Sequence, residues 1–481
     1  MTAAGGAASP AVVLLGIADV LAPLSARFID AGHELALVGG PVRDVLMGRD
    51  GGRIINDIDL TTDARPEDIE SLVSGWADHV WDVGMRFGTV GARKGDHRLE
   101  ITTYRSESYD PSSRKPEVTF GDTLAGDLAR RDFTVNAMAV RLPSLEFVDL
   151  HDGMRDLGET LLRTPGTPED SFADDPLRMM RAARFVSQLG FIIAPDVLEA
   201  MTAMASRLEI VSAERIRDEL SKLLLGAHPR RGLEVVVSTG LAPYVLPELP
   251  ALQLEIDEHH RHKDVYEHSL TVMEQAIDLE TDHAPASAPD LVLRLAALLH
   301  DIGKPKTRRF ETDGGVSFHH HEVVGARMVR KRLTALRFPN DIVEEVSKLT
   351  ELHLRFHGYG TGEWTDSAVR RYVRDSGDQL VRLHKLTRAD CTTRNRKRAA
   401  ALSAAYDGLE ARIEALAQQE ELASIRPDLD GNAIMEILGI SPGREVGQAY
   451  AFLMELRLDR GPLGHDEAQR ELLDWWAQRQ S

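Results

Sequence analysis

The sequence predicts an α+β protein in which a domain of mixed strands and helices comes first and an all-helical body follows. Between residues 34 and 150, short runs alternate apolar and polar positions, which is typical of half-buried strands. From Pro176 onward the pattern is helical almost throughout, and strand signals are scarce. The length of 481 residues exceeds what one core supports and indicates two to four domains.

The composition is that of a globular protein. Hydrophobic residues make up 43% of the chain and charged residues 28%. No apolar run approaches the ~20 residues that a membrane span needs, so we expect no membrane partner. Cys391 is the single cysteine, which excludes an internal disulfide and a thiolate metal site. The first residues lack the basic region of a signal peptide, and we therefore expect a reducing, cytoplasmic location.

The formal net charge of −19 argues against a protein that coats nucleic acid. Phosphate binding depends on local Lys and Arg, however, and not on the total charge. Two local clusters are present, "RRYVR" at 370–374 and "TRNRKR" at 393–398. Taken alone, each is better interpreted as a solvated helix face.

Turn signals and composition divide the chain into parts. Junctions that contain Pro and Gly fall near 225–256 and 280–290, and a polar region with a helical pattern runs from 399 to 422. Between residues 34 and 150, the alternating runs predict strands in "HELALVGG", "RIINDIDL", "FGTVGARK", "RLEITTYR" and "LEFVDLHDG". The segment "RPEDIESLVSGWAD" predicts a helix between them. The expected parts are a lead-in and helix at 1–33, a head at 34–165, a neck and body at 166–256, a histidine-rich domain at 257–400 and a helical tail at 401–481.

Two aspartates lie two residues apart in the run "IINDIDLTT". In a strand, Asp57 and Asp59 point to one face, while Ile58 and Leu60 point to the opposite face and into a core. Two close carboxylates repel each other unless a cation lies between them, and a hard divalent cation such as Mg²⁺ suits oxygen ligands. A solvated strand end with two exposed acids is the alternative interpretation.

A glycine turn precedes these aspartates. Gly39 and Gly40 follow the apolar run "ELALV" and precede a helix that we expect to begin at Pro41, so the backbone can approach a phosphate closely. Arg43 lies in the first turn of that helix, where its guanidinium can clamp a triphosphate. The spacing matches neither a Rossmann fingerprint nor a Walker A loop. Glu100, in an expected neighbouring strand, would complete a carboxylate triad.

Two further motifs follow. "RRDFTVNAMA" begins at Arg130, and alone it is also typical of a charged helix start before an apolar core helix. "DDPLRMMRAARF" begins at Asp174, and alone it is typical of a helix with Asp175 as N-cap and Pro176 at the first position. With the glycine turn and the aspartate pair, these motifs resemble in order and spacing the class II tRNA nucleotidyltransferases. These are the CCA-adding enzymes of the DNA polymerase β superfamily, with poly(A) polymerases as close relatives.

The resemblance covers about residues 34–250. It implies a polymerase-β-type nucleotidyltransferase head with a mixed sheet, followed by an elongated all-α neck and body. It also implies that Asp57 and Asp59 hold two Mg²⁺ ions, which would activate the RNA 3′-hydroxyl and neutralise the triphosphate. The expected catalytic carboxylates are therefore Asp57 and Asp59, together with Glu100, which the strand pattern adds. The expected nucleotide-binding residues are Gly39, Gly40, Arg43, Arg131, Asp132, Asp175, Arg178, Arg181 and Arg184.

In that family, the acid before the proline and the arginine three residues later act as a protein template for the base. Cytosine and adenine each present an amino donor beside a ring-nitrogen acceptor, so Asp175 can accept from the amine while Arg178 donates to the ring. Uracil and guanine present the opposite polarity and would leave both side chains mispaired. The family more often has Glu-Asp where this chain has Asp174-Asp175. "SAERIRDELSKLLL", from Ser212, resembles the family's fifth element, which we interpret as scaffold for the neck.

Histidines gather between residues 257 and 400. A His-Asp pair at the end of the apolar helix "LAALLHDIGKP", with a His before it and an Asp after it, can converge on one divalent ion. This order resembles the HD phosphohydrolase domain, here with a helical fold, and its extra-histidine variant can hold a second metal. A retained but inactive scaffold is the alternative. The expected ligands are His268, His300, Asp301 and Asp390, with His321 and His353 at the second metal.

The leading hypothesis is template-independent addition or repair of the 3′-terminal CCA of tRNA from CTP and ATP. Addition of A only, CC only or poly(A) is an alternative within the family, where the loop between Arg105 and Phe120 affects the switch from C to A. A phosphohydrolase for phosphomonoesters or 2′,3′-cyclic phosphates with an inert head is another, and a non-catalytic RNA-binding protein is the weakest. We expect the tRNA 3′ end as a partner, no obligate protein partner, and a divalent metal of open identity in the HD site.

Overall fold

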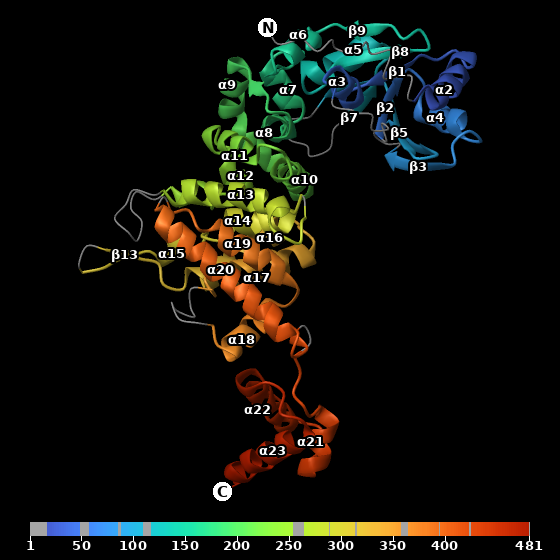
Figure 1. Cartoon of the computed structure of the whole chain (residues 1–481). Coiled ribbons are helices and arrows are strands. Elements are labelled where there is room, and N and C mark those ends of the chain that lie inside the picture. The colour runs from blue at the N-terminus through green and yellow to red at the C-terminus, as the bar shows by residue number, and fades with distance from the viewer. Residues whose placement is uncertain are drawn as a thin grey trace. The chain divides into compact units, whose positions relative to one another are not determined.

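The structure, a computed structural model, describes residues 17–48, 57–84, 88–108, 117–253, 264–287, 289–312, 315–356, 364–393, 395–422 and 425–480 (Figure 1). The expected lead-in up to residue 16, the first half of "RIINDIDL" and residues 109–116 of the loop after Arg105 lie outside the described residues. The chain divides into two compact units, Met1–Pro247 and Glu248–Ser481, and each is described by itself.

The first unit begins with a sheet of seven strands in the order β3-β4-β5-β2-β1-β8-β9. β2 and β5 are parallel, and the other neighbours are antiparallel. The strands are β1 (Leu35–Val38), β2 (Asp57–Thr62), β3 (His79–Gly84), β4 (Thr89–Lys94), β5 (His97–Thr103), β8 (Met138–Leu142) and β9 (Phe147–Asp149). A separate antiparallel pair consists of β6 (Arg105–Ser108) and β7 (Glu117–Phe120). The helices of this part are α2 (Ala18–Asp30), α3 (Gly40–Leu46), α4 (Pro66–Val73), α5 (Leu124–Ala129) and α6 (Gly153–Gly158).

Burial explains why β1 and β2 lie in the middle of the sheet. All four residues of β1 are buried, and in β2 the side chains of Ile58 and Leu60 are 1% exposed. Asp57 is exposed and Asp59 is half-buried, on the face opposite the core. The structure therefore confirms the alternation that the aspartate pair predicted.

The apolar part of "RRDFTVNAMA" forms a strand, so the core helix that its charged start also predicted is wrong. α5 ends at Ala129, a 3₁₀ turn covers Thr134–Asn136, and β8 follows between β1 and β9. Met138 and Ala139 are fully buried. A strand covered on both faces reads as a continuous apolar run, and periodicity alone does not distinguish such a run from a buried helix.

A helical neck completes the first unit. α8 (Leu177–Leu189) packs against α10 (Ala213–Leu224) and α11 (Pro229–Ser238). A Cβ atom on Gly232 would lie only 2.8 Å from the carbonyl oxygen of Ala183, so α8 and α11 approach closely. The other elements are α7 (Pro168–Asp174), α9 (Pro195–Met204), the 3₁₀ helix η4 (Ala205–Ile210), α12 (Ala242–Val245) and the parallel pair β10 (Leu161–Leu162) and β11 (Ile192–Ile193).

The described part of the second unit is helical apart from one short strand pair, as the pattern after Pro176 predicted. Its helix α14 (Leu291–Leu299) is buried on every side, with no residue from Val292 to Leu299 more than 6% exposed. The chain therefore leaves α14 at His300 inside the domain. No described helix combines the length and apolar character required to cross a bilayer. The other elements are the 3₁₀ helix η5 (Pro250–Leu252), α13 (Val265–Asp282), α15 (Lys304–Thr307), β12 (Arg309–Phe310), β13 (Val316–Ser317), α16 (His321–Ala335), α17 (Asn340–Leu352), α18 (Asp366–Ser376), the 3₁₀ helix η7 (Gly377–Gln379), α19 (Leu380–Ala389) and α20 (Arg396–Ala417).

The C-terminal helices, red in Figure 1, have a small core of their own. They are α21 (Gly431–Leu438), α22 (Arg444–Arg460) and α23 (His465–Gln480). The solvated face expected for 370–374 is wrong for Arg370, which is 5% exposed and pairs with Glu420 at 2.8 Å. Arg371 pairs with Asp459 of α22 at 2.7 Å. These arginines therefore tie α18 to the tail.

Candidate active sites

Three carboxylates meet where β2 and β5 run parallel. Asp59 is the Cα partner of Glu100, and Asp57 lies two residues before it on the same face. Burial raises the pKa of Asp59 and the charges of Glu100 and Asp57 raise it further, while Arg131 opposes the shift. The structure thus brings the three acids together, and a hard divalent cation between them would reduce their mutual repulsion.

The glycine turn lies against the same acids. Gly39 has φ = 74°, a left-handed conformation that favours glycine. A Cβ there would lie 3.3 Å from the Arg131 guanidinium and 3.6 Å from an Asp59 carboxylate oxygen. Asp127 holds Arg131 at 2.9 Å. α3 begins at Gly40, one residue earlier than expected. The turn, one guanidinium and one metal-ligand candidate therefore share a single small space.

Arg43 already has partners within the chain. Its side chain is largely buried, and it donates hydrogen bonds to Asn136 Oδ1 and to Asp44 Oδ1, each at 2.7 Å. Its guanidinium carbon also lies 5.3 Å from the ring centroid of Phe185. These contacts join α3 to the segment before β8, and the triphosphate clamp expected for Arg43 stays a prediction.

The arginines of α8 form a network with buried acids. Arg181 lies 2.6 Å from Asp132, and Arg184 lies 2.7 Å from Glu219. Burial alone would raise the pKa of Asp132, but the charge of Arg181 lowers it well below its usual range. Both guanidinium groups face the ring of Phe185, at 5.8 and 4.3 Å from its centroid. The network fixes two cations of α8 beside the second motif.

Asp175 and Arg178 lie together at the start of α8, and each has a partner. Asp175 accepts a hydrogen bond from the N–H of Leu177 at 3.1 Å and pairs with Arg215 at 2.7 Å. Arg178 is 7% exposed and donates to Ser171 Oγ at 2.8 Å and to a backbone carbonyl. The helix begins at Leu177 with Pro176 as its N-cap, so the expected N-cap at Asp175 is one residue too early, although Asp175 Oδ1 accepts from the first helical N–H. A base that contacts Asp175 must therefore share or replace Arg215.

Arg215 and Glu219 lie outside the expected set of site residues. Both belong to α10, which we interpreted as scaffold and which starts at the N-cap Ser212. A signal for Glu219 is present in the sequence, because it lies on the apolar face of the helix with Ile216 and Leu220. An acid in such a position is almost never buried unless it is paired. No comparable signal identifies Arg215.

Four imidazoles face one another in the second unit, and each is fixed through its Nδ1 atom. Nδ1 of His300, His321 and His353 lies 2.8, 2.8 and 2.6 Å from a backbone carbonyl oxygen. Nδ1 of His268 lies 3.1 Å from the hydroxyl of Thr392, a partner that the motif does not identify. With Nδ1 held by these acceptors, Nε2 is the ring nitrogen that each imidazole turns toward the others, which is the usual arrangement of metal-ligating histidines.

Asp301 lies between two groups of possible metal ligands. Its Oδ2 lies 3.2 Å from Nε2 of His300, and its Oδ1 lies 3.2 Å from Nε2 of His321. One carboxylate therefore offers an oxygen to each group, as a ligand shared by two ions would. The structure brings all six expected residues together, as the groups His268, His300 and Asp390, and Asp301, His321 and His353.

The charges of this cluster balance one another through a proton. Burial alone would lower the pKa of His300, but the charge of Asp301 raises it to about 9. Burial and the neighbouring His300 lower the pKa of His353 to about 3. The charges of His300 and of Lys304, which lies 2.9 Å from Asp301, thus offset the two carboxylates. A divalent ion would supply the same charge, so the donor set fits one.

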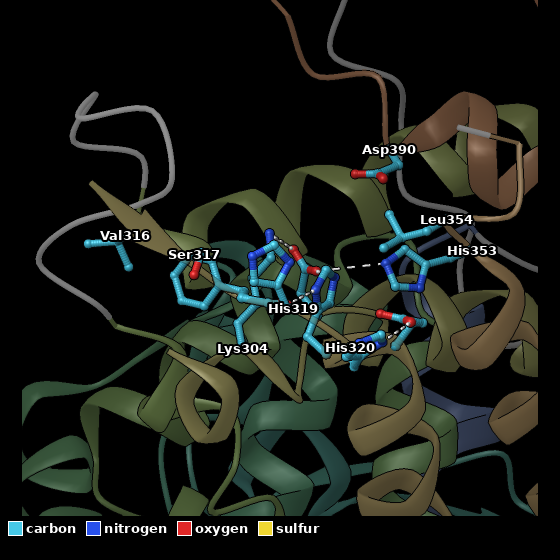
Figure 2. A pocket seen from close by; sticks show the side chains of 12 residues that line it. Lys304, Val316, Ser317, His319, His320, His353, Leu354 and Asp390 are labelled. Carbon is cyan, nitrogen blue, oxygen red and sulfur yellow. Dashed lines mark hydrogen bonds and ion pairs between the residues drawn. The ribbon is translucent and has the colours of Figure 1, made fainter. Parts of the chain in front are cut away.

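A cavity of about 480 Å³ opens onto the histidine cluster. Its lining includes Asp301, Asp390 and Lys304, and Nζ of Lys304 lies 2.9 Å from Asp301. Figure 2 shows Lys304 and Ser317 on one side of the cavity and Asp390 on the other. A substrate phosphate can therefore reach both ligand groups and a lysine from one opening.

Three stretches of the chain match known protein families. Residues 35–163 match the poly A polymerase head domain, and residues 190–252 match the probable RNA and SrmB-binding site of polymerase A. Residues 265–395 match the HD domain. The first and third matches contain the carboxylate and histidine clusters described above.

Curated relatives align with much of the chain. An A-adding tRNA nucleotidyltransferase from Deinococcus radiodurans is 35% identical over 366 residues, which is 74% of this chain and 80% of that protein. A CCA-adding enzyme from Levilactobacillus brevis is 41% identical over 227 residues, or 47% of this chain and 55% of that protein. The match thus spans about half the length of that relative. The fold is similar to the crystal structure of the Bacillus stearothermophilus CCA-adding enzyme with CTP, with a TM-score of 0.67 and 24% identity over 97% of this chain and 98% of that one.

Proposed function

The chain belongs to the tRNA nucleotidyltransferase and poly(A) polymerase family, and from this premise we propose that its head adds nucleotides to the 3′ end of tRNA without a nucleic-acid template. CTP and ATP are the nucleotides, and pyrophosphate is released. The observation that carries the proposal is Asp59, which is paired in register with Glu100 and lies against Gly39 and Arg131. The A-adding and CCA-adding relatives support it.

We assign the metal of this site as Mg²⁺, held by Asp57 and Asp59. The raised pKa of Asp59 supports the assignment, because three acids with only oxygen ligands suit a hard cation. When bound, the ions lower the pKa of the RNA 3′-hydroxyl and neutralise charge on the triphosphate and the leaving pyrophosphate. The chain itself supplies positioning: the Gly39 turn admits the triphosphate, and Arg131 faces it beside Asp59.

We assign the choice of base to Asp175 and Arg178. Asp175 accepts from the amino group of cytosine or adenine, and Arg178 donates to the adjacent ring nitrogen. Their position at one helix start supports this pairing, and Ser171 limits the movement of Arg178. The charged network of Arg181 and Arg184 on the same helix attracts the triphosphate.

Two products are candidates, complete CCA and a single A. The A-adding relative aligns over most of this chain, which favours A addition as the second candidate. We would incubate the protein with tRNAs that end before the CCA, after C and after CC, with CTP and ATP supplied separately and together, and sequence the products. CCA on the shortest tRNA supports the first candidate, and extension of only the tRNA ending in CC supports the second. No extension of any tRNA would overturn the proposed transferase.

A second activity is metal-dependent hydrolysis of phosphomonoesters or 2′,3′-cyclic phosphates by the HD domain. Nε2 of His321 faces Asp301 Oδ1 at 3.2 Å, and Nε2 of His353 is buried with no hydrogen-bond partner among the described residues, which supports metal binding there. Imidazole and carboxylate together suit a divalent transition metal. When bound, such ions polarise a phosphoryl oxygen and lower the pKa of water. Lys304 contributes a positive charge for the substrate phosphate at the cavity.

Metal analysis of the purified chain, with hydrolysis assays on p-nitrophenyl phosphate and 2′,3′-cyclic AMP before and after chelation, tests this activity. Hydrolysis that chelation abolishes and added metal restores supports it. Bound metal without hydrolysis of either substrate favours the inactive scaffold. We also propose a cytoplasmic location, where tRNA is available and the lone Cys391 stays reduced; fractionation of the producing cells tests this location.

A further inference from the structure

The hairpin beside the HD cavity exposes an aromatic ring to solvent. Phe310 is 69% exposed, the highest fraction recorded for a large hydrophobic side chain among the described residues. It lies in β12, which pairs antiparallel with β13. A single exposed apolar residue is ordinary on a protein surface. Only the position of this ring can indicate whether it belongs to a binding site.

That position is the rim of the cavity. Phe310 is the cross-strand partner of Val316, and Val316 and Ser317 line the cavity. Directly paired residues of an antiparallel ribbon project to the same face, with Cβ atoms about 4.5–5.5 Å apart. Phe310 is therefore the cross-strand neighbour of a residue that lines the cavity, and Figure 2 shows that residue, Val316, at the edge of the site.

Three cations precede the ring in the same segment, and one acid, Glu311, follows it. Lys306, Arg308 and Arg309 are all exposed, and the Arg308 guanidinium lies 5.1 Å from the Phe310 centroid. Where the chain is described, the ion pairs of this segment involve Lys304 and none of these three cations. An aromatic ring among unpaired cations is the composition of sites that bind single-stranded nucleic acid, in which bases stack and cations meet phosphates.

We propose that Phe310 stacks on the nucleobase of a nucleoside 3′-phosphate or 2′,3′-cyclic phosphate whose phosphate lies in the HD cavity. The inference rests on the proposed phosphohydrolase and deepens it, because a base platform selects nucleotides over other phosphomonoesters. Every base has a π face, so the platform accepts all four. A free nucleotide and the 3′ end of an RNA strand both present this chemistry.

Binding of a 2-aminopurine ribonucleoside 3′-phosphorothioate tests the proposal, because its fluorescence falls when the base stacks and the ester resists hydrolysis. With the full, metal-loaded chain, we expect Phe310→Ala to weaken binding by about 5- to 150-fold, the range for removal of one base–aromatic stack, and Phe310→Trp to retain it. Tyr450→Ala is the matched control, since Tyr450 is an aromatic residue of α22 that is 37% exposed. Asp301→Asn should also weaken binding of the probe, because Asp301 lines the HD cavity. That result would show that the fluorescence change arises from binding at this cavity.

Hydrolysis provides the second readout. We expect Phe310→Ala to lower kcat/KM for a 2′,3′-cyclic nucleotide and to leave it unchanged for glycerol 2-phosphate, which has no base. A pentaribonucleotide with a terminal 3′-phosphate, compared with the mononucleotide, distinguishes an RNA end from a free nucleotide as the ligand. Extension of tRNA by the head should stay at the wild-type rate, and unchanged hydrolysis of glycerol 2-phosphate verifies the fold of the HD domain.

Equal binding of the probe by wild type and Phe310→Ala would overturn the platform while leaving the phosphohydrolase intact. Failure of the wild type to bind the probe would also overturn it. Binding that depends on Phe310, without hydrolysis of any substrate, would support the base platform and contradict the proposed phosphohydrolase activity.

Discussion

The head and the HD domain both gather acids, but they hold them differently. In the head, Asp57 is exposed, and burial together with Glu100 raises the pKa of Asp59. In the HD domain, Asp301 is 2% exposed, and each of the four facing imidazoles is anchored through Nδ1. The first site offers oxygen alone, and the second offers nitrogen and oxygen in a fixed arrangement.

This difference indicates when each site acquires its full set of metal ligands. Mg²⁺ on two or three protein carboxylates takes its remaining ligands from water and substrate phosphates, so the nucleotide would complete the proposed Mg²⁺ site of the head. Oriented histidines hold a metal before any substrate arrives. The HD metal should therefore survive dialysis of the purified chain, while activity of the head should require added Mg²⁺.

Asp59→Asn should have the largest effect. Loss of a metal ligand removes charge stabilisation in the transition state, so kcat for tRNA extension should fall on the order of 10³-fold. Single-turnover extension with labelled CTP measures it, and unchanged hydrolysis by the HD domain is the internal control. A rate within tenfold of wild type would contradict the metal assignment.

Asp301→Asn should affect the HD domain and leave the tRNA extension activity of the head unchanged. Because Asp301 offers an oxygen to each ligand group, its loss should weaken metal binding in the HD domain by more than about 100-fold, beyond the 10- to 100-fold cost of losing an outer-shell partner. Metal content by mass spectrometry and tRNA extension are the readouts. Retained metal would show that the carboxylate is not a shared ligand.

Gly39→Ala should have a smaller effect on the head. The new Cβ would lie 3.3 Å from Arg131 and 3.6 Å from Asp59, and displacement of either should slow extension by roughly 10- to 100-fold. Gly75→Ala is the matched control, because Gly75 has φ = 72° and nothing lies within 4 Å of its Cβ position. Both variants place a Cβ on a residue with positive φ, so equal rates of extension would contradict the role of the contact.

Asp132→Asn should change stability and its pH dependence. Arg181 holds the folded pKa of Asp132 below its unfolded value, against the effect of burial. The carboxylate therefore contributes stability that is fully present above the unfolded pKa of about 3.9 and is lost as pH falls toward the folded value. We expect the variant to lose about 3 kcal/mol at pH 7 and to show a shallower decline below pH 4. Urea unfolding at both pH values measures this, and parallel declines would contradict it.

Local pattern predicts the ligands in both sites. A period of two puts Asp57 and Asp59 on one face, and the structure has them there. The run before His300 predicts an apolar helix that ends at the His-Asp pair, and α14 has Leu299 as its last residue and His300 as its C-cap. In each case, the information lies within about ten residues of chain, where periodicity and caps act.

The partners of these ligands depend on packing between distant segments. Thr392 meets His268 across 124 residues of sequence, and Arg215 meets Asp175 across 40. The same limit explains Arg370, which has the sequence of a solvated face but lies buried against Glu420. β8 shows a further limit of prediction from sequence. A continuous apolar run can form a buried strand or a buried helix, and the elements that pack against it determine which one forms.

Arg215 gives the proposed base pocket an internal competitor. Its guanidinium occupies the Asp175 carboxylate at 2.7 Å, so an incoming base must displace a donor that is already in place. Cytosine and adenine exchange one donor for another at small net cost. Uracil and guanine would break the ion pair and return an acceptor, which leaves the carboxylate uncompensated. In the proposed pocket, tight binding of the triphosphate alone would then not suffice for incorporation, because the base must also replace Arg215 at the carboxylate.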